Sequence, residues 1–154
     1  MKRFLFQSIG IIIISSLLGL LVNAVSSPSL PLIRPPDETG EKWTIVTGEE
    51  VLQHLQEGSS IFVDARDAKY FHEGRIPGAV NLPAASFGEA FAEIGEALPR
   101  DFLLIVYCQG DPCDESRDVL DHLELLGFQE LALYKGGWMD WEQNEYPLEV
   151  SEPL

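Results

Sequence analysis

Basic residues are scarce in this sequence. Among 154 residues there are 10 Lys and Arg against 25 Asp and Glu, and the formal net charge is −15. Proteins that bind nucleic acid hold its phosphates with clustered Lys and Arg. We therefore expect no nucleic-acid partner. The length suffices for one ordinary domain but hardly for two.

Cysteine and histidine are also scarce, with two and three copies. Two cysteines are too few for a disulfide-stapled miniprotein or a four-cysteine zinc site. The three histidines His54, His72 and His122 are scattered and have no metal-ligand spacing. We expect no metal and no cofactor, and the sequence identifies no Cys-His pair or Ser-His-Asp triad.

Charged residues are absent from residues 4–22, and Lys2 and Arg3 stand directly before this apolar run. A helix of that length is roughly 28 Å long, close to the hydrocarbon thickness of a bilayer. The run predicts one transmembrane or signal helix within residues 1–24, in contact with the membrane through residues 4–22. By the positive-inside rule the rest of the chain then lies on the extracytoplasmic (periplasmic) side.

Two fates of this segment remain open. Val22-Asn23-Ala24 has the small-residue pattern of a signal-peptidase site, so cleavage near Ala24 would give a secreted protein. The apolar run is longer than a usual signal-peptide core, which favours an uncleaved anchor. Residues 25–41 are rich in Pro and Ser and predict a linker, followed by a domain at 42–150 and a tail at 151–154.

Short apolar runs alternate with helical patterns through the domain, which predicts an α/β fold with a mostly parallel sheet. Thr47 and Ser86 are expected N-caps, and Gly58 and Gly127 are expected helix stops. The predicted strands are 45–46, 61–64, 79–81, 102–107 and 131–133, and the predicted helices are 48–57, 67–73, 86–98, 114–126 and 138–144.

Cys108 directly follows the most apolar of these strands. Parallel sheets place ligand sites at the carboxyl ends of strands, where backbone N–H groups stabilise a thiolate or an anion. Asp111, Asp114 and Glu115 oppose this effect by bringing negative charge to the same rim. From the residues alone Cys108 is either a reactive thiol or a buried structural cysteine.

Several runs together resemble the signatures of rhodanese-like (sulfurtransferase) domains. They are Phe62-Val63-Asp64-Ala65-Arg66 with Gly74 to Pro83, Leu104 to Cys108, and Gly136-Gly137-Trp138 with Trp141 and Tyr146-Pro147-Leu148. The resemblance covers Trp43 to about Val150. It implies a five-stranded parallel sheet flanked by helices and a catalytic cysteine that accepts sulfane sulfur as a persulfide.

Residue by residue, Cys108 corresponds to the sulfur-accepting nucleophile of that family. Its active-site loop corresponds to Gln109, Gly110, Asp111, Pro112 and Cys113. Asp64 and Arg66 match the family's Asp-x-Arg positions, for which we expect a charge pair that braces the loops. Trp138 and Trp141 are expected to pack in the core or form a lid.

The loop departs from the family in lacking a basic residue, since the first Arg after Cys108 is Arg117. Anionic thiosulfate would meet acidic side chains there, and a cysteine-based phosphatase or arsenate reductase would lack its Arg-like clamp. The expected partner is therefore a small sulfur-containing substrate or a protein thiol or persulfide.

Cys113 leaves more than one function open. It could form a disulfide with Cys108, or act as a resolving thiol that attacks a sulfur-modified Cys108. We predict an extracytoplasmic sulfurtransferase or persulfide carrier. The alternatives are a thiol–disulfide redox protein that uses both cysteines and a non-catalytic rhodanese-like binding module. The sequence specifies neither sulfur donor and acceptor nor the oligomeric state.

Overall fold

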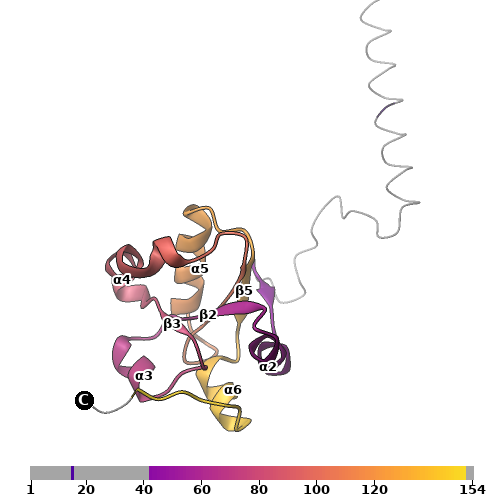
Figure 1. Cartoon of the computed structure of the whole chain (residues 1–154), viewed down its shortest axis with the longest axis vertical. Coiled ribbons are helices and arrows are strands. Elements are labelled where there is room, and N and C mark those ends of the chain that lie inside the picture. The colour runs from indigo at the N-terminus through magenta and orange to yellow at the C-terminus, as the bar shows by residue number, and fades with distance from the viewer. Residues whose placement is uncertain (1–14, 16–41, 152–154) are drawn as a thin grey trace, which may run out of the picture. The chain divides into compact units, whose positions relative to one another are not determined.

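The structure is a computed structural model that describes Ser15 and residues 42–151 (Figure 1). The predicted cleavage site, linker and most of the predicted membrane segment lie outside the described residues. Within the described part of the chain, no helix has the length and apolar character needed to cross a membrane.

The domain contains one five-stranded sheet in the order β1-β5-β4-β2-β3, and all neighbouring strands are parallel. The strands are β1 (Thr44–Ile45), β2 (Ser60–Asp64), β3 (Val80–Asn81), β4 (Leu103–Tyr107) and β5 (Leu131–Tyr134). The predicted α/β architecture is thereby confirmed, with strand ends within one or two residues of the prediction. The strand β4 pairs on both sides and lies at the centre of the sheet.

Helices cover both faces of the sheet, as Figure 1 shows. They are α2 (Gly48–Glu57), α3 (Ala68–Glu73), α4 (Phe87–Ile94), α5 (Glu115–Leu125) and α6 (Gly137–Gln143). Alternate residues of β4 point to opposite faces, as in any strand. Leu104 and Val106 pack in the layer with α4 and α5, whereas Ile105 and Tyr107 pack in the layer with α2 and α6.

The start of α2 matches its sequence signal in full. The Thr47 side chain accepts a hydrogen bond from the Glu50 amide, and the Glu50 carboxylate accepts one from the Thr47 amide. Gly58 ends the helix with a left-handed φ of 61°. The N-cap at Thr47 and the stop at Gly58 each depend on residues within one or two turns of the helix, so the sequence alone predicts them.

The predicted single helix from Ser86 to about Leu98 is wrong. The segment divides into a 3₁₀ turn (Ala84–Ser86), the helix α4, and a second 3₁₀ turn (Gly95–Ala97). Ser86 makes no side-chain capping bond. Phe91 packs directly over Gly95, where an added Cβ would lie 2.5 Å from its ring. The regular helix ends at this close contact. The contact requires a glycine, and the pattern of apolar residues does not predict that requirement.

Candidate active site

Cys108 directly follows β4 and is buried, with 2% of its surface exposed. Its side chain packs in the layer of α4 and α5, on the same face as Val106. Its carbonyl oxygen accepts a hydrogen bond from the Trp138 amide at 2.8 Å, and the Gln109 carbonyl accepts one from the Met139 amide at 2.9 Å. The first turn of α6 therefore fixes the backbone at the start of the cysteine loop.

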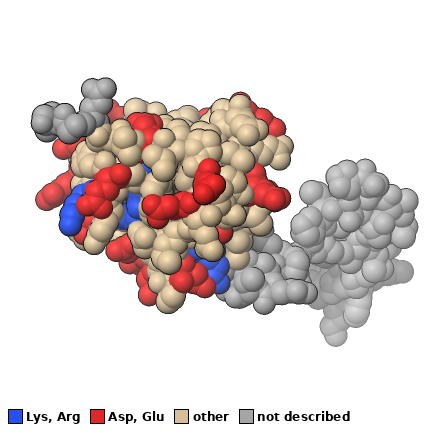
Figure 2. All heavy atoms as spheres, turned by 90° about the horizontal axis from the view of Figure 1, so that it is seen from below, with Lys and Arg blue, Asp and Glu red and all other residues tan. Residues whose placement is uncertain are grey.

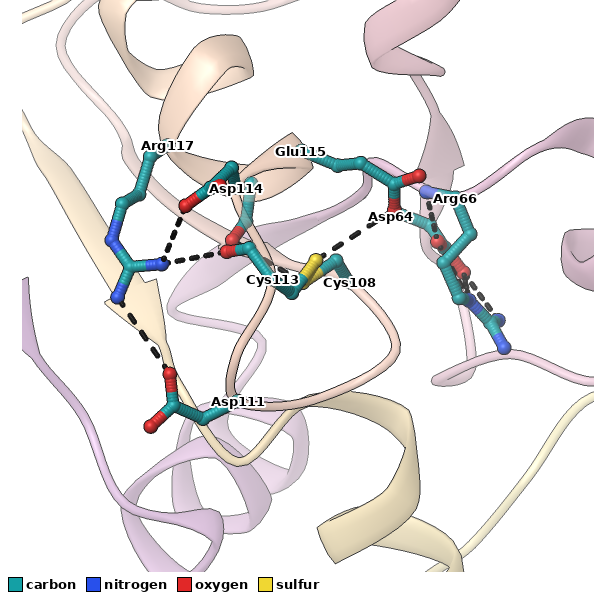
Figure 3. The surroundings of a disulfide bond; sticks show 9 residues. Asp64, Arg66, Cys108, Asp111, Cys113, Asp114, Glu115 and Arg117 are labelled. Carbon is teal, nitrogen blue, oxygen red and sulfur yellow. Dashed lines mark hydrogen bonds and ion pairs between the residues drawn. A yellow bond between two sulfur atoms is a disulfide. The ribbon is translucent and has the colours of Figure 1, made fainter.

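A disulfide joins Cys108 to Cys113 (Figure 3). Gln109, Gly110, Asp111 and Pro112 complete the loop, with a cis peptide before Pro112. Gly110 has a φ of 148°, and an added Cβ there would lie 3.1 Å from the Gly136 carbonyl. Cys113 is only partly buried, so it is the more accessible of the two sulfurs.

Ser116, in the first turn of α5, is a site residue that sequence reasoning missed. Its side chain is 2% exposed, and its Oγ lies 3.4 Å from Cys108 Sγ. A disulfide sulfur has no proton, so the hydroxyl is the donor of this hydrogen bond. A Ser near the start of a helix after a cysteine loop is a weak signal, because the contact depends on where α5 packs.

The charges around the loop are more balanced than the sequence suggested. Asp111 lies 3.4 Å from Lys135 Nζ and 3.9 Å from Arg117 Nη2, and Asp114 lies 3.7 Å from Arg117 Nη1. Arg117 also donates a hydrogen bond of 2.6 Å to the Cys113 carbonyl. Asp111 and Asp114 therefore face cations, which corrects the expectation that all three acidic residues act on Cys108 alike.

Glu115 is the acidic residue that does approach the sulfurs. Its Oε2 lies 3.7 Å from Cys113 Sγ. Burial raises the pKa of the Glu115 carboxyl, and the negative charges of Asp67 and Asp64 raise it further, against the opposing effect of Arg66. The carboxyl thus titrates above its ordinary range.

Asp64 and Arg66 form a buried ion pair next to this loop. Arg66 Nη2 donates to Asp64 Oδ2 at 2.6 Å and to the Gly74 carbonyl at 2.7 Å, and Arg66 Nε donates to Asp64 Oδ1 at 3.0 Å. The guanidinium lies 4.8 Å from the ring centroid of Trp138. The pair therefore connects the end of β2 with the turn after α3 and with α6.

A pocket of about 580 Å³ lies beside the loop. Its lining residues come from the segment after β2, from α3 and the residue after it, from the cysteine loop, from the start of α5 and from α6; they are Arg66, Asp67, Tyr70, Glu73, Gly74, Gln109, Glu115, Trp138 and Glu142. Four are acidic, and Arg66 is paired with Asp64. Figure 2 shows many acidic and few basic side chains on the face it presents. The pocket therefore disfavours anions.

The histidines lie away from the cysteines. His54 bonds to Ser59, His72 bonds to Ser151, and His122 bonds to the Asp118 carbonyl. No Cys-His pair is formed within residues 42–151. In the same range, no three His, Cys, Asp or Glu side chains are grouped as metal ligands.

The structure is therefore an α/β domain with a parallel sheet covered on both faces and a cysteine loop between its central strand and a helix. Residues 47–144 match the family described as Rhodanese-like domain, and the chain belongs to that family.

Two of the similar proteins have thiosulfate sulfurtransferase in their names. The thiosulfate sulfurtransferase GlpE of Glaesserella parasuis serovar 5 is 29% identical over 110 residues, which cover 71% of this chain and 96% of that protein. The mouse thiosulfate sulfurtransferase/rhodanese-like domain-containing protein 3 is 30% identical over 120 residues, which cover 70% and 73%.

Two further similarities concern a longer protein and a solved structure. The HTH-type transcriptional regulator Rv0324 of Mycobacterium tuberculosis is 27% identical over 136 residues, covering 87% of this chain but only 58% of the regulator. The crystal structure of the BH2092 protein from Bacillus halodurans has a TM-score of 0.62 and 25% identity, covering 70% of this chain and 77% of that one.

Proposed function

We propose that this domain is a sulfurtransferase or persulfide carrier in which Cys108 accepts a sulfane sulfur and Cys113 is its resolving cysteine. In this proposal the Cys108–Cys113 disulfide is the oxidised state, and a thiol must open it before Cys108 accepts sulfur. The disulfide carries the proposal, because it places a second cysteine in bonding distance of the residue that occupies the family's nucleophile position.

The exposure of the two sulfurs favours an order of events. Cys108 is almost fully buried and Cys113 is partly accessible, so an external thiolate attacks Cys113 Sγ first. Cys108 then leaves as a thiolate next to the Ser116 hydroxyl, which donates a hydrogen bond to it. A second thiol releases Cys113 from the mixed disulfide, and the reduced site is ready for a sulfur donor.

The charge of the adjoining pocket supports a donor other than thiosulfate. Asp67, Glu73, Glu115 and Glu142 line it, and its Arg66 is already paired with Asp64. A doubly charged anion entering this space would be repelled, whereas a neutral or cationic persulfide would not. We therefore propose a small or protein-borne persulfide as donor.

The test is sulfur loading of the reduced full chain, followed by intact mass. We expect a persulfide donor to add the mass of one sulfur atom more efficiently than thiosulfate does. The adduct should be lost in Cys108→Ser and should accumulate in Cys113→Ser. Failure of both donors to modify Cys108 in the Cys113→Ser chain would contradict the proposal.

A thiol–disulfide redox protein is the second candidate, and the disulfide itself favours it. In that case the two cysteines cycle between dithiol and disulfide with a partner thiol, and no sulfur adduct forms on Cys108. If neither reaction occurs and both cysteine variants behave as the wild type, the domain acts as a non-catalytic binding module.

We further propose that residues 4–22 anchor the chain in a membrane with the domain on the extracytoplasmic side. The uncharged run after Lys2 and Arg3 supports this proposal. Protease added to intact cells or spheroplasts should digest the domain, and the domain should fractionate with membranes. Release into the medium with a new N-terminus near residue 25 would instead indicate cleavage.

A further inference from the structure

We propose that Glu115 transfers the proton in the resolving step, in which Cys113 attacks a persulfide on Cys108 and releases hydrogen sulfide. This inference rests on the proposed function. It assigns a catalytic role to a side chain that does not belong to the cysteine loop itself.

The Glu115 carboxylate lies next to Cys113 Sγ and also lines the pocket. Glu115 is the first residue of α5, two residues after Cys113, and its Oε2 lies 3.7 Å from Cys113 Sγ (Figure 3). The same side chain lines the pocket of about 580 Å³ beside the loop. Asp111 and Asp114 instead lie near the cationic groups of Arg117 and Lys135.

The step balances without an outside oxidant. Cys113 gives its proton to the Glu115 carboxylate and becomes a thiolate, which attacks Cys108 Sγ of the Cys108 persulfide. The new Cys108–Cys113 bond forms while the bond between Cys108 Sγ and the outer sulfur breaks. The outer sulfur leaves as hydrosulfide with the bonding electron pair, and protonated Glu115 returns the proton to give hydrogen sulfide. Cys113 is oxidised and the outer sulfur is reduced.

The surroundings adapt Glu115 to this role. A thiol attacks only as its thiolate, and a base is most effective when its pKa lies near the working pH. Burial and the charges of Asp67 and Asp64 raise the Glu115 pKa, with Arg66 opposing. Asp118, on the same helix, also raises the pKa of Glu115. The other acidic residues that line the pocket with Glu115 are Asp67, Glu73 and Glu142.

If Glu115 acted only as a negative charge, its replacement would have the opposite effect on the rate of resolution. A fixed carboxylate beside Cys113 would disfavour its thiolate, so replacing Glu115 by glutamine would speed resolution. Proton transfer predicts that the same replacement slows it. The two roles therefore differ in the sign of one measured rate.

The experiment follows persulfide decay in a single turnover. The reduced full chain is mixed with a persulfide donor and quenched at intervals, and the adduct, the disulfide and released hydrogen sulfide are quantified. The variants are Glu115→Gln, Glu115→Asp and the control Asp114→Asn, whose side chain is 95% exposed and faces Arg117. Cys113→Ser, which cannot resolve, defines the rate of background loss.

With a neutral persulfide donor, we expect Glu115→Gln to resolve the adduct at least about tenfold more slowly than the wild type, whatever its loading rate. In the wild type the rate of resolution should fall at low pH, where Glu115 becomes protonated. This fall should be absent in Glu115→Gln. Glu115→Asp should recover part of the rate, and Asp114→Asn should match the wild type. An unchanged or faster resolution in Glu115→Gln overturns the role of Glu115 alone. Absence of any adduct in Cys113→Ser overturns the proposed function and, with it, this inference.

Discussion

The peptide N–H of Trp138 donates a 2.8 Å hydrogen bond to the carbonyl oxygen of Cys108. This bond joins the end of the central strand to the first turn of α6, two segments that are 30 positions apart. The neighbouring Gly137 makes the approach possible. It has a φ of 60°, and an added Cβ would lie 2.5 Å from the Cys108 oxygen and 2.8 Å from the Gly110 nitrogen.

Gly137→Ala should therefore damage the cysteine loop as well as the fold. Its matched control is Gly58→Ala, where φ is 61° and an added Cβ meets nothing within 4 Å. The control should lose about 1 kcal/mol from left-handed strain alone, and Gly137→Ala should lose about 1–3 kcal/mol more from the clash. Urea unfolding measures both, and sulfur loading of Cys108 should fall only in Gly137→Ala. Equal losses in the two variants would show that the contact has no energetic weight.

Local signals account for much of what the sequence could predict about this domain. The N-cap at Thr47 and the strand residues Leu104 to Tyr107 could be predicted because they depend on neighbours a few positions away. The position of Cys108 at the end of the central strand follows from the same pattern. The limits of α4 were not readable, because Phe91 packing over Gly95 is a matter of three-dimensional fit.

The charge environment of the site could be predicted from the sequence only in part, because it depends on contacts between elements that are far apart along the chain. The sequence places Asp111 in a loop that lacks a basic residue, but Lys135, directly after β5, lies 3.4 Å from it. Glu115 looked equivalent to Asp114, yet only Glu115 turns toward Cys113 and toward Asp67. Neither distinction follows from spacing along the chain.

Asp64→Asn should destabilise the domain strongly. The substitution leaves the Arg66 guanidinium buried without its carboxylate, since the side chains of Arg66 and Asp64 are 3% and 0% exposed. Removing one partner of a buried pair costs about 3–5 kcal/mol. The comparison is Asp121→Asn, which removes an exposed partner of Lys42 and should leave the unfolding midpoint nearly unchanged. A similar midpoint for both variants in chemical denaturation would contradict a bracing role for Asp64.

Glu115 lines the acidic pocket and also lies 3.7 Å from Cys113 Sγ, so we expect reduction of the disulfide to depend on the charge of the thiol. Cysteamine, 2-mercaptoethanol and mercaptoacetate are small thiols that are cationic, neutral and anionic. With rates expressed per thiolate and normalised to a free disulfide, we expect them to decrease in that order and to converge as salt is added. Glu73→Gln combined with Glu142→Gln should reduce the differences among the three rates, because both residues line the pocket.

The control for this charge series removes the same number of charges from another place. Glu49→Gln combined with Glu57→Gln alters two exposed residues of α2 that do not line the pocket. Its spread of rates should stay close to that of the wild type. If the three thiols react alike in the wild-type chain at low salt, the pocket does not control access to the disulfide.

Ser116→Ala tests how the buried hydroxyl supports Cys108 once the disulfide is open. The Ser116 Oγ lies 3.4 Å from Cys108 Sγ and stays buried with it. A hydrogen bond to a charged acceptor contributes about 1.5–3 kcal/mol, so its loss should shift the pH midpoint of Cys108 alkylation upward by about one to two units. The measurement uses a Cys113→Ser background, in which Cys108 is the only cysteine. Ser86→Ala, at an exposed serine that caps no helix, should leave the midpoint in place. An unchanged midpoint in Ser116→Ala would show that the Ser116 hydroxyl does not stabilise the Cys108 thiolate.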